Sequence, residues 1–221
     1  MFNFKLSFFL LICLILFLIY SFAEANVLNY LDENFSEIKA YTLSNPKYSR
    51  LYFFIFYLIM ATFALPVALI LGLISGMLFP LGDAILIVSF ASSFGALGSF
   101  YISRYFLKDF FQQRYSKDYI LINEGFVRNG ASYLFALRMC MLFPYFLINV
   151  VSGLTSIRPL IYYFVTQVGM LPATIVVIML GKNLEIFRTD NVFSIDAEII
   201  VLLTLVGLIP LASKYFLKKY L

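Results

Sequence analysis

The side chains of this chain that could do chemistry are a few ions and amides set in or beside long apolar segments. Arg138 is the only charge within residues 129–157, and Asn149 follows it in the same stretch. A charge deep in a bilayer costs on the order of 2.5–3.5 kcal/mol, so it usually faces a cavity or a partner. The always-charged guanidinium fork of Arg138 suits phosphate binding, and snorkelling to the interface or structural pairing is the alternative. Asn149 could hydrogen-bond between helices or to a bound group.

Two further charged candidates, Asp83 and Arg104, stand at the two ends of the apolar segment 84–103. A cation at the C-terminal end of a helix interacts favourably with the helix dipole and with membrane head groups, or it is only a structural charge. Asp83 could carry a coupling proton or pair with an arginine, and a helix N-cap is the alternative interpretation.

The residue inventory argues against catalysis. The chain has no histidine, which excludes histidine-based nucleophilic pairs and histidine-ligated zinc. Intramembrane aspartyl chemistry requires two carboxylates, and the long apolar segments hold only Asp83. The Gly181-Lys182 pair has Val176 where a phosphate-binding loop requires glycine. Both cysteines lie inside apolar segments, where they act as small hydrophobes. We therefore predict that the protein is not an enzyme and holds no cofactor or metal.

The composition predicts an all-α integral membrane protein. Of the 221 residues 62% are hydrophobic and 13% are charged, which is too few charges for the polar shell of a soluble domain. The apolar residues form long blocks rather than alternating, and in lipid only a helix lets such a block satisfy its own backbone. The net charge of +4 comes without a dense basic stripe, so no nucleic-acid binding is expected.

The polar and apolar blocks divide the chain into segments. Residues 1–23 are predicted to form a membrane helix, and a cleaved signal peptide is the alternative because Ala23-Glu24-Ala25 resembles a cleavage site. Residues 24–50 carry Phe35 and Ile38 at helical spacing, which indicates an amphipathic helix on the membrane surface or a packed loop helix.

The membrane core is predicted over residues 51–182. Residues 51–82 and 129–157 are interrupted by helix breakers, and they are read as re-entrant hairpins or, for the first, as ordinary helices. Each precedes an apolar span, residues 84–103 and 159–181. The breakers assigned to the hairpins are Pro66, Gly72, Gly76, Pro144 and Gly153.

The charges between the segments set a topology. Cytoplasmic loops are enriched in Lys and Arg, so the basic loop 104–128 and the lysine-rich end of residues 199–221 are placed in the cytoplasm, and the acidic loop 183–198 outside. With one span on each side of the basic loop, each breaker-rich segment must leave and return on the same face. The predicted fold is an inverted repeat of two hairpins, each followed by a spanning helix, with a membrane helix at each end of the chain.

Two groups of residues resemble the motifs of the DedA / SNARE-associated Golgi protein superfamily. The first group is Gly76-Met-Leu-Phe79, Gly95-Ala-Leu-Gly98-Ser-Phe100 and Arg104-Tyr105. The second group is Arg138, Phe143-Pro144-Tyr145, Asn149, Gly153-Leu154-Thr155, Tyr162 or Tyr163, Gly169, Pro172 and Gly181. Met141 and Phe146 depart from the pattern, where many members carry proline and asparagine, and this resembles the branch with yeast and animal Golgi relatives.

The resemblance implies two facing re-entrant hairpins and lipid handling. Members of the superfamily are linked to moving polyprenyl-phosphate or phospholipid head groups and to phospholipid scrambling. The expected protein is therefore a multi-pass flippase or scramblase of a bacterial inner membrane, with both termini cytoplasmic and an anionic phospholipid or lipid phosphate as its partner. A homo-oligomer is allowed. A proton- or ion-coupled solute transporter and a membrane-protein assembly factor are the alternatives.

Overall fold

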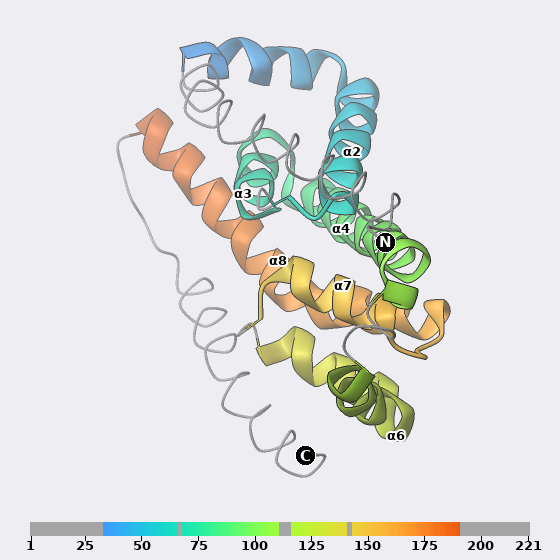
Figure 1. Cartoon of the computed structure of the whole chain (residues 1–221). Coiled ribbons are helices and arrows are strands. Elements are labelled where there is room, and N and C mark those ends of the chain that lie inside the picture. Colours follow the sequence, from blue (N-terminus) through green and yellow to red (C-terminus); the bar gives the residue numbers. More distant parts are fainter. Residues whose placement is uncertain (1–32, 66–67, 111–115, 141–142, 191–221) are drawn as a thin grey trace.

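The computed structural model describes residues 33–65, 68–110, 116–140 and 143–190, and this part of the chain is helical throughout, with no strand (Figure 1). A helical segment over residues 33–44 precedes the labelled helices and bends at Asn45. Two of the labelled helices, α4 and α8, are long and apolar enough to cross a membrane. The labelled helices are α2 (Pro46–Thr62), α3 (Ala68–Leu78), α4 (Leu81–Phe106), α6 (Ser116–Cys140), α7 (Tyr145–Leu154) and α8 (Pro159–Asp190).

The end of α2 is fixed by backbone hydrogen bonds of the Schellman type. The Leu65 N–H donates to the Met60 carbonyl and the Ala64 N–H donates to the Ala61 carbonyl. This motif requires a left-handed residue, and Ala64 takes that conformation with a φ of 58°. Glycine normally occupies such a site, because a Cβ there is crowded by the next carbonyl.

Prolines mark the beginnings of four of the labelled helices. Pro46 is at the first turn of α2, where its missing N–H needs no acceptor. Pro80 and Pro144 are the N-cap residues of α4 and α7, with extended backbone. Pro159 is the first residue of α8. The break before α7 thus coincides with the predicted breaker Pro144, whereas Pro66 lies outside the described residues.

Three glycines predicted as breakers lie inside helices instead. Gly72 and Gly76 are within α3, and Gly153 is the second-last residue of α7. Each lies where another helix approaches closely. A Cβ on Gly76 would be 2.0 Å from the Ile178 carbonyl oxygen, and one on Gly153 would be 2.5 Å from the Phe100 carbonyl oxygen. These glycines permit close helix packing rather than ending helices.

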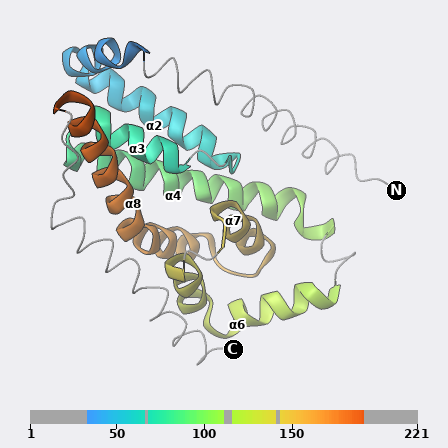
Figure 2. The same cartoon turned by 90° about the vertical axis from the view of Figure 1, so that its left-hand side faces the viewer.

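The two short helices α3 and α7 each pack on a long helix of the other half of the chain. The helix α3 contacts α8, and α7 contacts α4, so each short helix packs on the long helix that follows the other (Figures 1 and 2). The helices α2 and α6 pack on α4 and α8, the long helices that follow them in the chain. The small residues of α4 lie in these interfaces, where Ala91, Ser99 and Ser103 are buried and Gly95 lies against Ala61 of α2.

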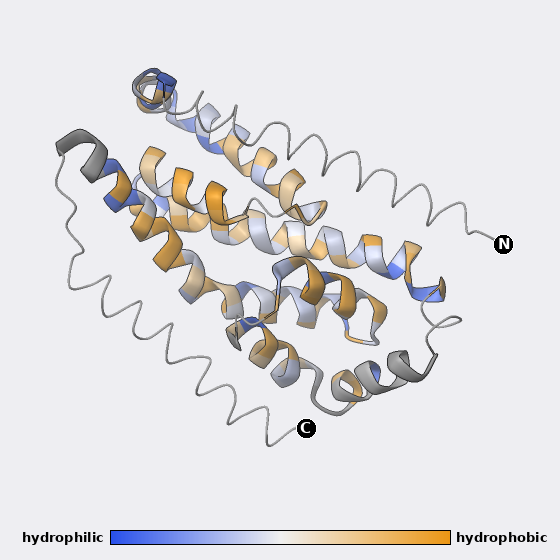
Figure 3. Ribbon diagram, turned by 60° about the vertical axis from the view of Figure 1, so that its left-hand side comes forward, coloured by the Kyte–Doolittle hydropathy of each residue, from blue (hydrophilic) through white to orange (hydrophobic). Residues whose placement is uncertain are grey.

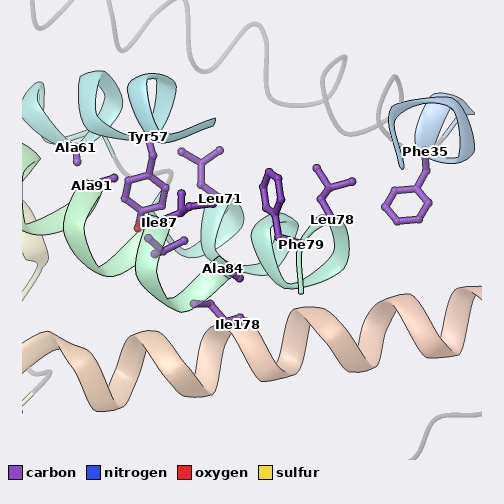
Figure 4. Packing of buried hydrophobic residues seen from close by; sticks show 11 residues of the cluster. Phe35, Tyr57, Ala61, Leu71, Leu78, Phe79, Ala84, Ile87, Ala91 and Ile178 are labelled. Carbon is purple, nitrogen blue, oxygen red and sulfur yellow. The ribbon is translucent and has the colours of Figure 1, made fainter. Parts of the chain in front are cut away.

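One hydrophobic core fills the space between α2, α3, α4 and α8. Tyr57, Leu71, Ile87 and Ile178 converge there (Figure 4). Phe35 is 7% exposed and belongs to the same cluster. The helix that carries Phe35 therefore packs on the fold through this side chain, and its placement on the membrane surface stays a prediction. A second core lies between α4, α6, α7 and α8.

Two predicted loops are helical over most of the residues that the structure describes in them. The loop 104–128 includes the end of α4 and the first half of α6, and residues 183–190 of the loop 183–198 continue α8. Neither stretch contains a proline, and charged residues such as Glu185 and Lys117 are good helix formers, so charge alone did not mark a helix end. Residues 1–32 and 191–221, with the membrane helices predicted in them, lie outside the described residues.

The hydropathy pattern agrees with a membrane core. Figure 3 shows hydrophobic residues over α3, α7 and much of α8, and hydrophilic residues toward the ends of α2, α4 and α8. Large apolar side chains are exposed on the outer faces of the long helices, among them Phe90, Phe94, Leu160 and Phe164. Such surfaces are stable against lipid and unfavourable in water.

Candidate functional site

The Arg138 guanidinium lies at the centre of a buried polar cluster. Its Nη2 donates to Asn149 Oδ1 at 2.6 Å, to Tyr162 Oη at 2.8 Å and to Thr166 Oγ1 at 3.3 Å. Tyr162 Oη is also 2.8 Å from Asn149 Oδ1 and 3.3 Å from the Ala96 carbonyl oxygen. Arg138 is 6% exposed and Asn149, Tyr162 and Thr166 are completely buried.

Within the described part of the chain, the cluster has donors without acceptors and a charge without a counter-ion. Arg138 Nε and Asn149 Nδ2 are buried and have no hydrogen-bond partner among the described residues. Neither of the ion pairs in the described part of the chain, Lys39–Glu185 and Arg50–Asp83, involves Arg138. An unpaired buried donor costs about 1–3 kcal/mol, more when it is charged. The cluster is therefore electrostatically suited to an anion or another acceptor.

Three helices hold this cluster in place. Arg138 is in the last turn of α6, Asn149 is in the middle of α7, and Tyr162 and Thr166 are one turn apart on α8. Gly169 continues the same face of α8, and a Cβ there would be 2.9 Å from Arg138 Cβ. Without a side chain at this position, the arginine backbone can approach α8 closely.

Arg104 binds backbone carbonyls at the end of α7. It is in the last turn of α4, where its Nε donates to the Gly153 carbonyl and its Nη2 donates to the Thr155 and Ile157 carbonyls at 2.7 and 2.8 Å. These carbonyls lie at or just after the C-terminal end of α7, where no backbone N–H of that helix donates to them. The Arg104 guanidinium also lies 4.3 Å from the centre of the Phe100 ring. Arg104 thus fixes the chain between α7 and α8.

Asp83 pairs with an arginine, as one of the predicted alternatives had it. Arg50 Nη2 lies 2.5 Å from Asp83 Oδ2, and the pair joins the beginning of α2 to the first turn of α4. The N-cap of α4 is Pro80 and not Asp83. The Arg138 cluster lies at Ala96 of α4, between Asp83 and Arg104 along the helix. With a rise of about 1.5 Å per residue, the cluster is about 20 Å from Asp83 and about 12 Å from Arg104.

Neutralising Asp83 is expected to change stability only slightly. The side chains of Arg50 and Asp83 are 40% and 32% exposed, and exposed pairs contribute about 0–1 kcal/mol. The melting temperatures of Asp83→Asn, Arg50→Gln and the double variant in detergent should therefore be close to that of the unchanged protein. If either single variant melts at a much lower temperature, and the double variant melts no lower than that single variant, the ion pair is strong instead.

Two members of the cluster were not among the predicted site residues. Tyr162 entered only as part of a motif, and Thr166 was not singled out. The signal was present in the sequence, because residues 162, 166 and 169 recur at helical spacing within an apolar span.

Gln167 also lies on α8 and donates to the Ser89 hydroxyl on α4, which extends the polar contacts between the two long helices.

The fold and the cluster define an α-helical membrane protein with a buried cationic site. The VTT domain matches residues 65–183, more than half of the chain, and this range includes α3, α4, α6, α7 and nearly the whole apolar part of α8. The chain therefore belongs to the VTT-domain family, the DedA / SNARE-associated Golgi family, and the resemblance found in its motifs is confirmed.

Relatives occur in animals and bacteria. Transmembrane protein 41 homolog of Caenorhabditis elegans is 28% identical over 167 residues, 74% of this chain and 67% of that protein. Transmembrane protein 41B of Xenopus tropicalis is 25% identical over 172 residues, 76% of this chain and 62% of that protein. Uncharacterized protein YqeD of Bacillus subtilis is 27% identical over 134 residues, 59% of this chain and 62% of that protein. The chain thus spans about two thirds of the length of these relatives. No solved structure matches it.

Proposed function

We propose that the protein moves the anionic head groups of membrane lipids across the bilayer without ATP, as a flippase or scramblase. The observation that carries the proposal is the buried Arg138 cluster, which has a positive charge without a counter-ion and two donors without acceptors among the described residues. A guanidinium binds a phosphate through two parallel hydrogen bonds, and Arg138 Nε is free for one of them. In this proposal the protein acts as a transporter and not as an enzyme.

The geometry of α2 and α3 supports a hairpin that enters the membrane and returns. Along α2, Arg50 is level with Asp83 of α4 and Ala61 is level with Gly95, so α2 runs in the same direction as α4. It ends near the middle of α4, after about 18 Å at 1.5 Å per residue between Asp83 and Gly95. The hydrocarbon core is about 30 Å thick, so α3 returns from within it.

The second half of the core repeats this geometry in the opposite direction. Gly130 of α6 lies near Ile157, and Arg138 bonds to Thr166, so α6 runs in the same direction as α8. The long helices run against each other, because Ser89 of α4 contacts Gln167 of α8 while Tyr162 lies at Ala96. In this reading, the two hairpins enter from opposite faces and their ends meet near the Arg138 cluster.

This arrangement lowers the barrier that a head group meets in hydrocarbon. A charged group that leaves water loses its hydration and gains nothing in an apolar medium. The Arg138 guanidinium, the Asn149 amide and the backbone groups freed at the helix breaks would replace part of that water. A site of this kind needs no tight binding, so we expect weak selectivity among anionic head groups.

The distribution of basic and acidic residues between the apolar segments supports one membrane orientation. We propose a bacterial inner membrane, with residues 104–128 and both termini on the cytoplasmic face and residues 183–198 outside. Lipid is the proposed partner, with an anionic phospholipid or a lipid phosphate as the moving species. A homo-oligomer is compatible with this arrangement.

Liposomes that contain the purified protein are expected to exchange a fluorescent anionic phospholipid between leaflets without ATP. A membrane-impermeant quencher added outside destroys only outer-leaflet fluorescence in empty liposomes. Exchange brings inner-leaflet lipid outward, so the fluorescence of proteoliposomes should fall further and with a measurable rate. Proteoliposomes that quench no further than empty ones would contradict the proposal. In that case, solute uptake driven by a pH gradient would favour the ion-coupled transporter.

A further inference from the structure

We infer that a pocket between α6 and α7 is a second subsite that holds one hydrocarbon chain of the anionic lipid whose head group lies at Arg138. This inference rests on the proposed function. The pocket has a volume of about 130 Å³, and its walls are almost entirely apolar side chains of α6, α7 and the break between them. A chain and a head group would then be held on the same two helices.

The pocket leads from the surface of the protein to a buried floor. Phe143 and Leu147 stand at its rim and are 43% and 38% exposed. Phe126, Ile148 and Ser152 line its interior and are buried. Because Phe135 of α6 and Phe146 of α7 are also exposed, we place the rim in the medium in which lipid chains lie.

The pocket adjoins the cationic cluster along both helices. Leu137 in its wall precedes Arg138, and Ile148 precedes Asn149. Ser152 is three residues after Asn149, on the same face of α7, and its hydroxyl is completely buried with no partner among the described residues. A buried hydroxyl without a partner is unfavourable. An ester or phosphate oxygen at the junction of head group and chain would supply the missing acceptor.

The size and charge of the site select the occupant. An apolar cavity of roughly 150 Å³ holds one benzene molecule, so this pocket accepts a short length of a single chain and excludes a hydrated head group. The Arg138 charge beside it, which has no counter-ion among the described residues, is complementary to an anionic amphiphile, and it would repel a cationic one. The occupant is therefore the chain of an anionic lipid, with only its first carbons in the pocket.

Filling the rim is expected to slow lipid movement several-fold without unfolding the protein. Leu147→Trp places an indole at the mouth of the pocket, on a side chain that is already partly exposed. Leu160→Trp is the matched control, because Leu160 is 73% exposed on α8 and does not line the pocket. Ser152→Ala removes an unpaired hydroxyl, so its melting temperature should be unchanged or higher while its lipid movement is slower. A merely structural Ser152 would leave lipid movement unchanged.

Photolabelling locates the chain independently of activity. Liposomes of phosphatidylcholine are prepared with a phosphatidylglycerol that carries a diazirine near the ester end of one chain, and the labelled peptides are identified by mass spectrometry. The subsite is supported if the walls of the pocket are labelled, and if this label is lost in Leu147→Trp and kept in Leu160→Trp. Label only on outer faces such as that of α8, unchanged in Leu147→Trp, would overturn it and indicate that another part of this chain or a second copy covers the pocket. If lipid movement depends on Arg138 while Leu147→Trp and Ser152→Ala are fully active, the subsite fails and the proposed function stands.

Discussion

Arg138→Ala is expected to slow lipid movement by a factor of about ten to about 150, because a hydrogen bond to a charged group contributes about 1.5–3 kcal/mol. The variant should still accumulate in the membrane. Tyr162 Oη and Asn149 Oδ1 are 2.8 Å apart and can pair with each other once the guanidinium is gone. Removing a buried charge that has no counter-ion among the described residues also removes a cost of membrane insertion. The rate of transbilayer exchange and the amount of protein in the membrane are both measured.

Two further variants give this result its meaning. Arg138→Lys should restore only part of the rate, because an ammonium keeps the charge but cannot form the two parallel bonds of a guanidinium to phosphate. Arg158→Ala is the control, since Arg158 is an exposed arginine outside the cluster and its replacement should have little effect. Full activity of Arg138→Ala would assign the residue to a structural or interfacial role. Loss of the protein from the membrane would show that the charge is needed for folding.

The centre of the site could be predicted from the sequence because Arg138 and Asn149 interrupt an apolar segment. In a membrane protein an ion or amide in such a segment has few stable positions other than the interior. The partners on α8 were harder to predict, because Tyr162 and Thr166 are common in apolar helices and become informative only when another helix places a guanidinium against them. Which residue meets which across helices depends on packing, and no local pattern encodes it.

Arg104 and Asp83 show the opposite case. Both were recognised as charges at the ends of a span, and both lie at the ends of α4. The structure assigns Arg104 to the carbonyls at the end of α7 and Asp83 to Arg50, so neither reaches the Arg138 cluster. Sequence position identified where these charges lie along the helix. It could not identify their partners, because Arg104 and Thr155 are more than fifty residues apart.

Gly76→Ala is expected to destabilise the fold by at least about 1–3 kcal/mol, the usual range for overpacking a well-packed core. The added Cβ would be 2.0 Å from the Ile178 carbonyl oxygen and 2.9 Å from the Lys182 backbone nitrogen. Both neighbours are backbone atoms of α8, so no side chain can rotate away and α3 must move as a whole. Gly181→Ala probes the same contact from the other helix, since its Cβ would be 2.1 Å from the Leu73 carbonyl oxygen. Both variants should melt at lower temperature in detergent and accumulate less in the membrane.

Gly82→Ala is the matched control for this prediction. A Cβ on Gly82 meets nothing within 4 Å, and the residue is exposed in the first turn of α4. Alanine is the better helix former by about 1 kcal/mol, so this variant should be as stable as the unchanged protein or slightly more stable. The three glycine variants therefore add the same methyl group and differ only in what that group meets. If Gly76→Ala and Gly82→Ala melt at the same temperature, α3 does not approach α8 closely. The crossed packing, in which each short helix lies on the long helix of the other half, is then also wrong.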